Sequence, residues 1–111
     1  MTAAVSPPFL VATKLEAFAG RGRGDYIASS DFADIVSMVD GRVELVNEVA
    51  GGPLELREYL ADEFARHVRH PRFLDGVHGQ LLPDSANQDR AERVVVPRID
   101  AIIDARSSGP G

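Results

Sequence analysis

The stretch PLELREYLADEFARHVRH, residues 53–70, decides the fold class of this chain. Its large apolar residues recur at spacings of three and four, which places them on one side of an α-helix. Pro53 suits a helix start, because the first helical position needs no N–H donor. Pro71 predicts the stop, since the residue before a proline is biased away from helical geometry. The apolar side consists of Leu56, Tyr59, Leu60, Phe64 and Val68.

Two further helices are expected before this stretch. The Ser-Pro-Pro at residues 6–8 indicates a helix start, because serine caps free amides and proline is tolerated in the first turn. The glycines from Gly20 onward predict its end and a loop at residues 20–24. Ser30 is the predicted cap of the second helix, which breaks at Gly41.

The remaining sequence also favours helices. A short third helix is expected over residues 43–49, and a short helical turn begins at Pro71 and ends near Gly76, followed by a loop over residues 77–84. A last helix is expected over residues 85–106, and Pro97 inside it predicts a kink or break.

These patterns predict an all-α fold, a compact bundle of about five or six helices in one domain. The β-branched run at residues 94–96 is the one strand candidate, and a single short strand cannot form a sheet. Residues 6–106 form the predicted helical domain. Residues 1–5 are expected to be a residual strand or a disordered start, and residues 107–111 a disordered tail.

Composition narrows the function classes. The chain has 111 residues and a net charge of −5, which argues against a broad nucleic-acid surface. It has no cysteine, so disulfides, thiolate catalysis and cysteine-bound zinc are excluded. No apolar run approaches the ~20 residues that span a bilayer. The start of the sequence does not resemble a secretory signal, and a cytoplasmic location is expected.

Three groups of residues bear on chemistry. His67 and His70 are spaced for one helical face, and His78 follows eight residues later. Nearby arginines and the lack of an acidic ligand favour surface or partly buried histidines over a metal site. Arg21 and Arg23 lie among glycines, which suits either a phosphate or a solvated connection.

Lys14 is the third candidate, because it lies among apolar neighbours on the first helix. Such a cation is paired, reaches a ligand, or extends its amine to water. Asp31 and Asp34 begin the second helix, where the helix dipole alone accounts for them.

Three blocks of the first half carry a family resemblance. They are ATKLEAF at residues 12–18, RGRGD at residues 21–25 and SSDFADI at residues 29–35. This pattern resembles the polymerase-beta-like nucleotidyltransferase superfamily, in particular the abortive-infection (type IV toxin) group and its uncharacterised relatives. The similarity extends over about residues 5–104, and outside the first blocks it concerns ordinary helix.

The resemblance implies that Lys14 and Asp31 help to build a nucleotide site, with Arg21, Arg23 and Asp34 as further candidates. The lysine would steady triphosphate charge. The family's Gly-Ser turn and metal-binding carboxylate pair, which hold the divalent ions, have no counterpart in this sequence.

The chain is therefore expected to correspond to the C-terminal half of the family, and not to transfer nucleotides by itself. Mg²⁺ and a nucleoside triphosphate would bind once a catalytic half completes the site. The expected partner is an N-terminal catalytic chain, or a second copy through the first helix. In the first case that helix should keep an exposed apolar face. The alternative function is a stand-alone helical interaction or antitoxin-like regulatory module.

Overall fold

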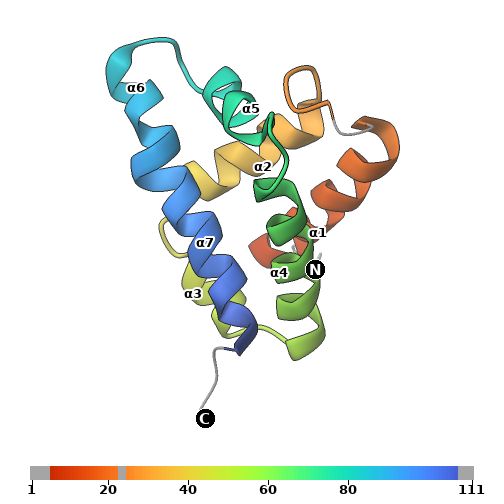
Figure 1. The fold of residues 1–111 in the computed structure, drawn as a ribbon. Coiled ribbons are helices and arrows are strands. Elements are labelled where there is room, and N and C mark those ends of the chain that lie inside the picture. The colour runs from red at the N-terminus through yellow and green to blue at the C-terminus, as the bar shows by residue number, and fades with distance from the viewer. Residues whose placement is uncertain (1–5, 23–24, 108–111) are drawn as a thin grey trace, which may run out of the picture.

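The computed structural model describes residues 6–22 and 25–107, and every regular element within these ranges is helical. The described residues form six continuous helices: α1 with η1, then α2, α3, α4, α5, and a last helix that joins α6, η2, α7 and η3 (Figure 1). The predicted all-α bundle is therefore confirmed. The expectations for residues 1–5 and 108–111 lie outside the described residues.

The first helix is longer than its glycines suggest. α1 spans Pro7–Ala17, and one π-helical turn, η1, continues it over Phe18–Gly22. The predicted start is confirmed, because Ser6 is the N-cap residue and prolines occupy the first turn, although the side chain of Ser6 makes no capping hydrogen bond. The predicted end at Gly20 is wrong, because the π-helical turn continues to Gly22. Phe18 is fully buried against other rings, and this packing holds the following glycine in a helical turn.

The second and third helices begin close to their predicted positions. α2 spans Ser30–Gly41 and α3 spans Leu45–Ala50. The cap of α2 is Ser29 and not Ser30, because Ser29 still has extended backbone geometry. Its Oγ accepts a hydrogen bond from the N–H of Phe32 at 3.2 Å, which satisfies one free amide of the first turn.

Two helices follow the Gly-Gly turn. α4 spans Leu54–Val68, as the apolar spacing predicts, and α5 spans Phe73–Gln80. The predicted end near Gly76 is wrong for a tertiary reason. A Cβ at Gly76 would lie 2.3 Å from the Cβ of Tyr26, so this glycine permits close packing instead of ending the helix. The Gln80 side chain then donates to the carbonyl oxygen of Tyr26 at 3.0 Å.

The last helix contains a widened turn next to its proline. α6 (Ser85–Arg90), η2 (Ala91–Val95), α7 (Val96–Asp104) and η3 (Ala105–Ser107) follow one another without interruption. Pro97 has no N–H to donate, so it cannot form the α-helical bond of its position. The π-helical turn η2 ends at Val95, two residues before Pro97, and the helix continues where a break was one expectation.

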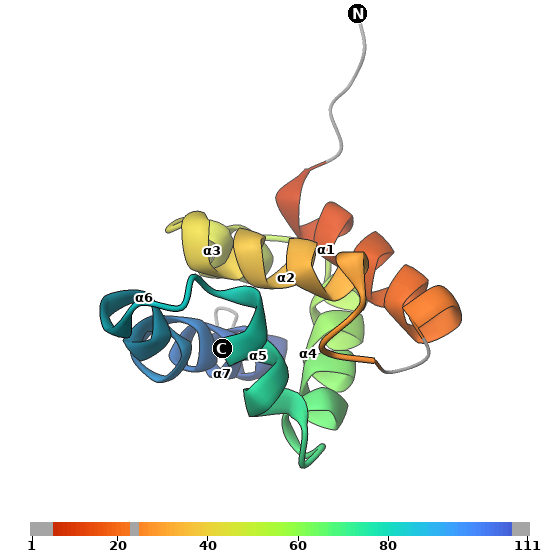
Figure 2. The same cartoon turned by 90° about the horizontal axis from the view of Figure 1, so that it is seen from above.

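The helices enclose one core. α4 packs against α1 and against α7, α2 packs against α1 and α5, and α5 also contacts α4 and η2 of the last helix (Figure 2). No described helix is both long and apolar enough to cross a membrane. The largest fully buried side chains are Phe18, Phe64, Leu15, Ile35, Leu45, Leu60, Ile99 and Ile102.

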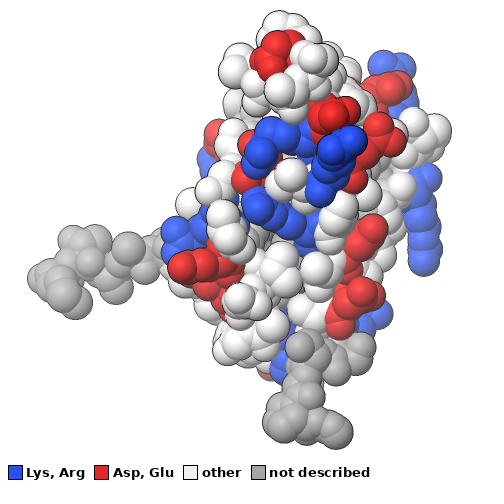
Figure 3. Space-filling model, turned by 90° about the vertical axis from the view of Figure 1, so that its left-hand side faces the viewer, with Lys and Arg blue, Asp and Glu red and all other residues white. Residues whose placement is uncertain are grey.

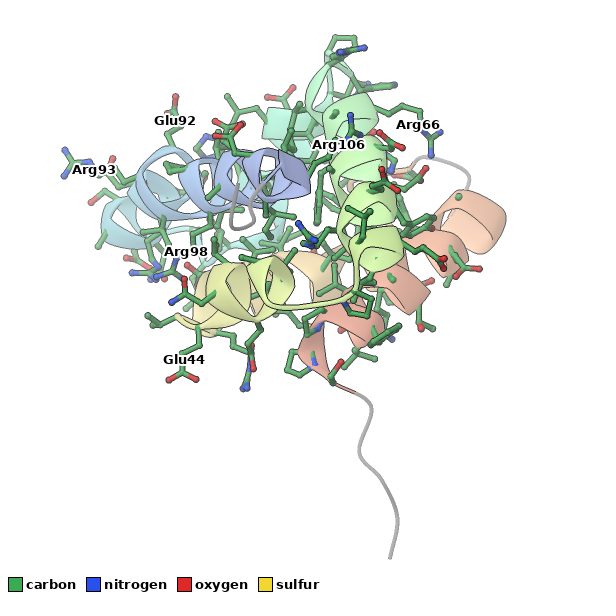
Figure 4. All side chains as sticks on the ribbon, turned by 90° about the horizontal axis from the view of Figure 1, so that it is seen from below. Glu44, Arg66, Glu92, Arg93, Arg98 and Arg106 are labelled. Atoms are coloured by element: carbon green, nitrogen blue, oxygen red, sulfur yellow. The ribbon has the colours of Figure 1, made fainter. Side chains whose placement is uncertain are left out.

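Arginines of the last helix hold the C-terminal end of α2. Arg98 lies between α7 and α3 and donates to the carbonyl oxygens of Val39 and Asp40 at 2.9 and 2.7 Å (Figure 4). The Nε of Arg90 lies 2.7 Å from a carboxylate oxygen of Asp40. Cations at a helix C-terminus are favourable. The side that α6, α7 and α3 form carries charges of both signs, intermingled (Figure 3).

Candidate functional site

The structure brings together three of the residues that the sequence singles out. Lys14 extends from α1 toward the first turns of α2, which packs beside it (Figure 2). Its Nζ lies 2.8 Å from Oδ2 of Asp34 and 3.7 Å from Oδ1 of Asp31. The side chains of Lys14 and Asp31 are 28% and 6% exposed, whereas that of Asp34 is 52% exposed. The cluster therefore runs from the interior to the surface.

The charges of Lys14, Asp31 and Asp34 compensate one another. Asp31 is nearly buried, and an uncompensated carboxylate there would cost several kcal/mol. The ammonium group of Lys14 supplies that compensation while it contacts Asp34 at the surface. A phosphate group that approaches Lys14 must therefore compete with Asp34.

The structure does not describe the side chains of the two arginines of the predicted site. Arg23 lies outside the described residues, and for Arg21 the structure describes the backbone in η1 but not the side chain. The predictions for both arginines therefore remain predictions.

An apolar surface adjoins the lysine cluster on α1. Leu10 lies one helical turn before Lys14 and is 37% exposed, and Phe9 is 47% exposed. A shallow hollow of about 360 Å³ lies between α1 and α4. A second hollow, of about 340 Å³, shares part of its lining, and it also contains Ser6, Pro8, Glu48 and the Gly-Gly turn. The residues common to both hollows are Phe9, Pro53 and Leu56.

Sequence reasoning missed a second polar contact, which lies in the core. The hydroxyl of Tyr26 lies 2.7 Å from Nδ1 of His67, and both residues are buried. The Nε2 atom of His67 is also buried and has no hydrogen-bond partner among the described residues. The rings of Phe18, Phe32 and Phe73 pack around Tyr26. No spacing rule links positions 26 and 67, so only the isolated aromatic at the end of the glycine loop could have indicated this contact.

Burial shifts the pKa values of both groups away from their charged forms. It lowers the pKa of His67, and the nearby Arg66 guanidinium lowers it further. It raises the pKa of Tyr26, an effect that Arg66 opposes. Both residues are therefore neutral near pH 7, which fits a single hydrogen bond inside a ring cluster.

The other two histidines have local partners of their own. Nδ1 of His70 accepts a hydrogen bond from the backbone N–H of Arg72 at 3.1 Å. Nδ1 of His78 lies 2.9 Å from Oε1 of Gln88, whose amide also donates to backbone carbonyls. Within the described ranges no three His, Asp or Glu side chains are grouped so that they could hold a metal ion.

Comparisons of this chain with protein-family models, with curated proteins and with solved structures found no match. The all-α fold class follows from the described helices. The resemblance to nucleotidyltransferases rests on the sequence alone.

Proposed function

We propose that this chain is the non-catalytic helical half of a nucleotidyltransferase, and that α1 packs against a separate catalytic half to complete a nucleotide site. The observation that carries this proposal is the apolar surface of α1. Apolar residues occur on every side of this helix, and a helix of that kind is normally covered on every side. Here Phe9 and Leu10 remain exposed.

The position of this surface supports the same proposal. Leu10 and Lys14 lie on one side of α1, so a partner that covers the leucine also approaches the lysine. Burial of exposed apolar surface by a partner stabilises a complex, while the neighbouring polar groups orient it. The nucleotide would then lie between the partner and the start of α2, next to Lys14 and Asp34.

The ion pair at the surface is compatible with a role in phosphate binding. Exposed ion pairs contribute about 1 kcal/mol or less, so exchanging Asp34 for a phosphate oxygen costs little. Asp31 remains against the ammonium group from the buried side and limits its movement. In this proposal Lys14 steadies triphosphate charge, and the Mg²⁺ bound by the catalytic half neutralises the phosphates.

Lys14 offers a direct test, because it is the only lysine in the sequence. Acylation by an N-hydroxysuccinimide ester, followed by mass spectrometry of peptides, reports on this amine, and the α-amine of the chain is an internal control. We expect millimolar magnesium–nucleoside triphosphate to slow acylation of Lys14 but not of the α-amine. Asp34→Asn should strengthen the protection, and Glu16→Gln, an exposed substitution on the same helix, should leave it unchanged. If Lys14 is acylated equally with and without nucleotide, in the unsubstituted chain and in both variants, this chain does not bind the nucleotide at Lys14.

The docking part of the proposal has its own test. An adjacent reading frame that encodes Gly-Ser and Asp-x-Asp would supply the candidate partner for co-expression. We expect the two chains to co-purify and Phe9→Ser with Leu10→Ser to separate them, while Val43→Ser, at an exposed valine after α2, does not. Co-purification that survives the double change on α1 would contradict docking through this helix.

One observation favours a second candidate function, a stand-alone helical interaction or antitoxin-like regulatory module. The charge of Lys14 is already compensated inside the domain by Asp31 and Asp34, so no phosphate is needed there. In that case nucleotides do not protect Lys14, and a protein partner or a second copy covers Phe9 and Leu10. Sedimentation of the isolated chain distinguishes a homodimer from a monomer that awaits another partner.

A further inference from the structure

The hollow between α1 and α4 has an apolar floor that both helices build. α1 and α4 pack side by side (Figure 2). The apolar lining consists of Phe9 and Ala12 from α1, Leu56 and Tyr59 from α4, and Pro53 just before α4. Helices pack by placing the side-chain ridges of one into the grooves of its neighbours, so the space between two helices suits a third.

Two carboxylates lie in the lining of the same hollow, one from each helix. Glu16 belongs to α1 and Glu55 to the first turn of α4, and both residues are exposed. Among the residues that the structure describes, no lysine, arginine or histidine lines this hollow. Glu58 lies one turn after Glu55 on α4 and adds a third exposed carboxylate.

These three carboxylates differ from their acidic neighbours, because they are not compensated. Within residues 6–22 and 25–107, no ion pair joins Glu16, Glu55 or Glu58 to a cation. The neighbouring carboxylates that do pair with arginines are those of Glu48, Asp62 and Glu63. The hollow therefore keeps a net negative charge.

The tyrosine in the floor of the hollow is sensitive to that charge. Burial raises the pKa of Tyr59 most, and the carboxylates of Glu63 and Glu16 raise it further, while Arg66 opposes them. Carboxylates from both helices thus act on one hydroxyl and disfavour a second negative charge there. The same field favours a cation.

The negative charge also distinguishes between possible occupants. A second copy related by two-fold symmetry would bring Glu16 and Glu55 close to the same residues of its partner, because both copies use the same surface. Nucleic acids and anionic lipid surfaces are negative themselves and would be repelled. A protein segment with apolar and basic side chains complements both the floor and the charge of the hollow.

We propose that the hollow between α1 and α4 binds a basic amphipathic helix of a partner protein. The apolar side of that helix packs on Phe9, Leu56 and Tyr59, and lysines or arginines on its flanks pair with Glu16 and Glu55. This inference rests on the proposed docking through α1 and specifies its chemistry: the separate catalytic half presents this basic helix.

The probe is a fluorescein-labelled helical peptide with Leu at spacings of three and four and Lys elsewhere, compared with the same peptide carrying Glu in place of Lys. We expect fluorescence anisotropy to show that the basic peptide binds about tenfold more tightly than the acidic one. Glu16→Lys with Glu55→Lys should reverse that preference. Glu92→Lys with Asp100→Lys, the same change in net charge at exposed residues of the last helix, should keep it.

The apolar floor has its own matched pair. Phe9→Ala should weaken binding of the basic peptide, whereas Leu82→Ala, at a more exposed side chain in the loop after α5, should not. Thermal unfolding checks that each variant folds. If the double lysine variant does not fold, Glu16→Gln with Glu55→Gln should still reduce the preference for the basic peptide.

Three outcomes would overturn the inference. They are equal binding of the two peptides, binding that Phe9→Ala leaves unchanged, and self-association of the chain that requires Phe9. These outcomes can be separated from a failure of the proposed function. If the catalytic half co-purifies but Glu16→Lys with Glu55→Lys does not weaken its binding, docking stands and the basic helix is wrong. If the basic peptide binds as expected while nucleotide does not protect Lys14, only the nucleotide role fails.

Discussion

Two polar contacts join distant segments of this chain, and their environments differ. The Tyr26–His67 and Lys14–Asp34 contacts have almost the same length, 2.7 and 2.8 Å. The first is neutral and lies inside a shell of aromatic rings, whereas the second is charged and reaches the surface. The two contacts are therefore distinguished by their burial and not by their length. A buried pair cannot exchange its partner without opening the core, and a surface pair can, so only the second is suited to meet a ligand.

The largest expected effect concerns the ring shell around Tyr26. Phe18→Ala removes a fully buried ring and should lower the free energy of unfolding by about 3–5 kcal/mol. The matched substitution Phe9→Ala, at a ring that is 47% exposed, should cost about 1 kcal/mol or less. Urea unfolding followed by circular dichroism measures both. Equal losses would mean that the ring shell does not distinguish the interior contact from the surface.

The hydroxyl inside that shell should have the next largest effect. Tyr26→Phe keeps the ring but leaves Nδ1 of His67 without a partner, at an expected cost of about 1–3 kcal/mol. Tyr59→Phe, at a half-buried tyrosine, is the control and should change stability by about 0.5 kcal/mol or less. If Tyr26→Phe and Tyr59→Phe unfold at the same urea concentration, the buried hydrogen bond of Tyr26 does not stabilise the fold as expected.

The buried His67 should make the stability of the fold depend on pH. The pKa of His67 is lowered in the folded protein from its ordinary value of 6.5, first by burial and then by Arg66. Above pH 6.5 the ring is neutral in both states. Below it the unfolded chain binds a proton that the folded chain resists, so stability should fall as the pH falls, by up to about 1.4 kcal/mol per pH unit for this one proton.

The pH measurement is best confined to pH 7 to 5.5, where carboxylates contribute little. Glu63 opposes the lowered pKa of His67, and His70 supports it, so their charges belong to the same environment. His67→Gln should remove the corresponding part of the slope. A slope that His67→Gln leaves unchanged would mean that His67 is not the cause of the acid sensitivity.

The smallest expected effect concerns the surface ion pair. Asp34→Asn should lower the free energy of unfolding by about 1 kcal/mol or less, and added salt should reduce the difference. Asp100→Asn, an exposed aspartate of α7, is the control for changing one surface charge. A loss as large as that of Tyr26→Phe would show that the contact is structural, and the proposed exchange of Asp34 for phosphate would then be untenable.

The sequence predicted the position of α4 correctly but not the ends of two other helices. The apolar spacing of residues 54–68 located α4, because a helix face of that size has to be buried whatever covers it. The predicted ends at Gly20 and Gly76 are wrong, since both glycines lie in turns that buried rings hold helical. Local preference for a break is worth about 1 kcal/mol per glycine, which tertiary packing readily outweighs.

The candidate site was predicted in part. Lys14 could be identified from the sequence as a cation among apolar neighbours, but its partners could not, because Asp31 and Asp34 are explained equally well by the start of α2. The Tyr26–His67 contact could not be predicted at all. Its two members are far apart in sequence and meet only through the packing of α4 beside η1.

The sequence alone determined that this chain is helical, roughly where its helices lie, and which residues are apolar enough to form a core. These properties depend on spacing along the chain and on local backbone preference, which neighbouring residues set. Only the tertiary structure decided which polar groups meet and which leucines stay exposed. Those depend on the packing of segments distant in the sequence, where burial changes the free energy of a contact more than its local pattern does.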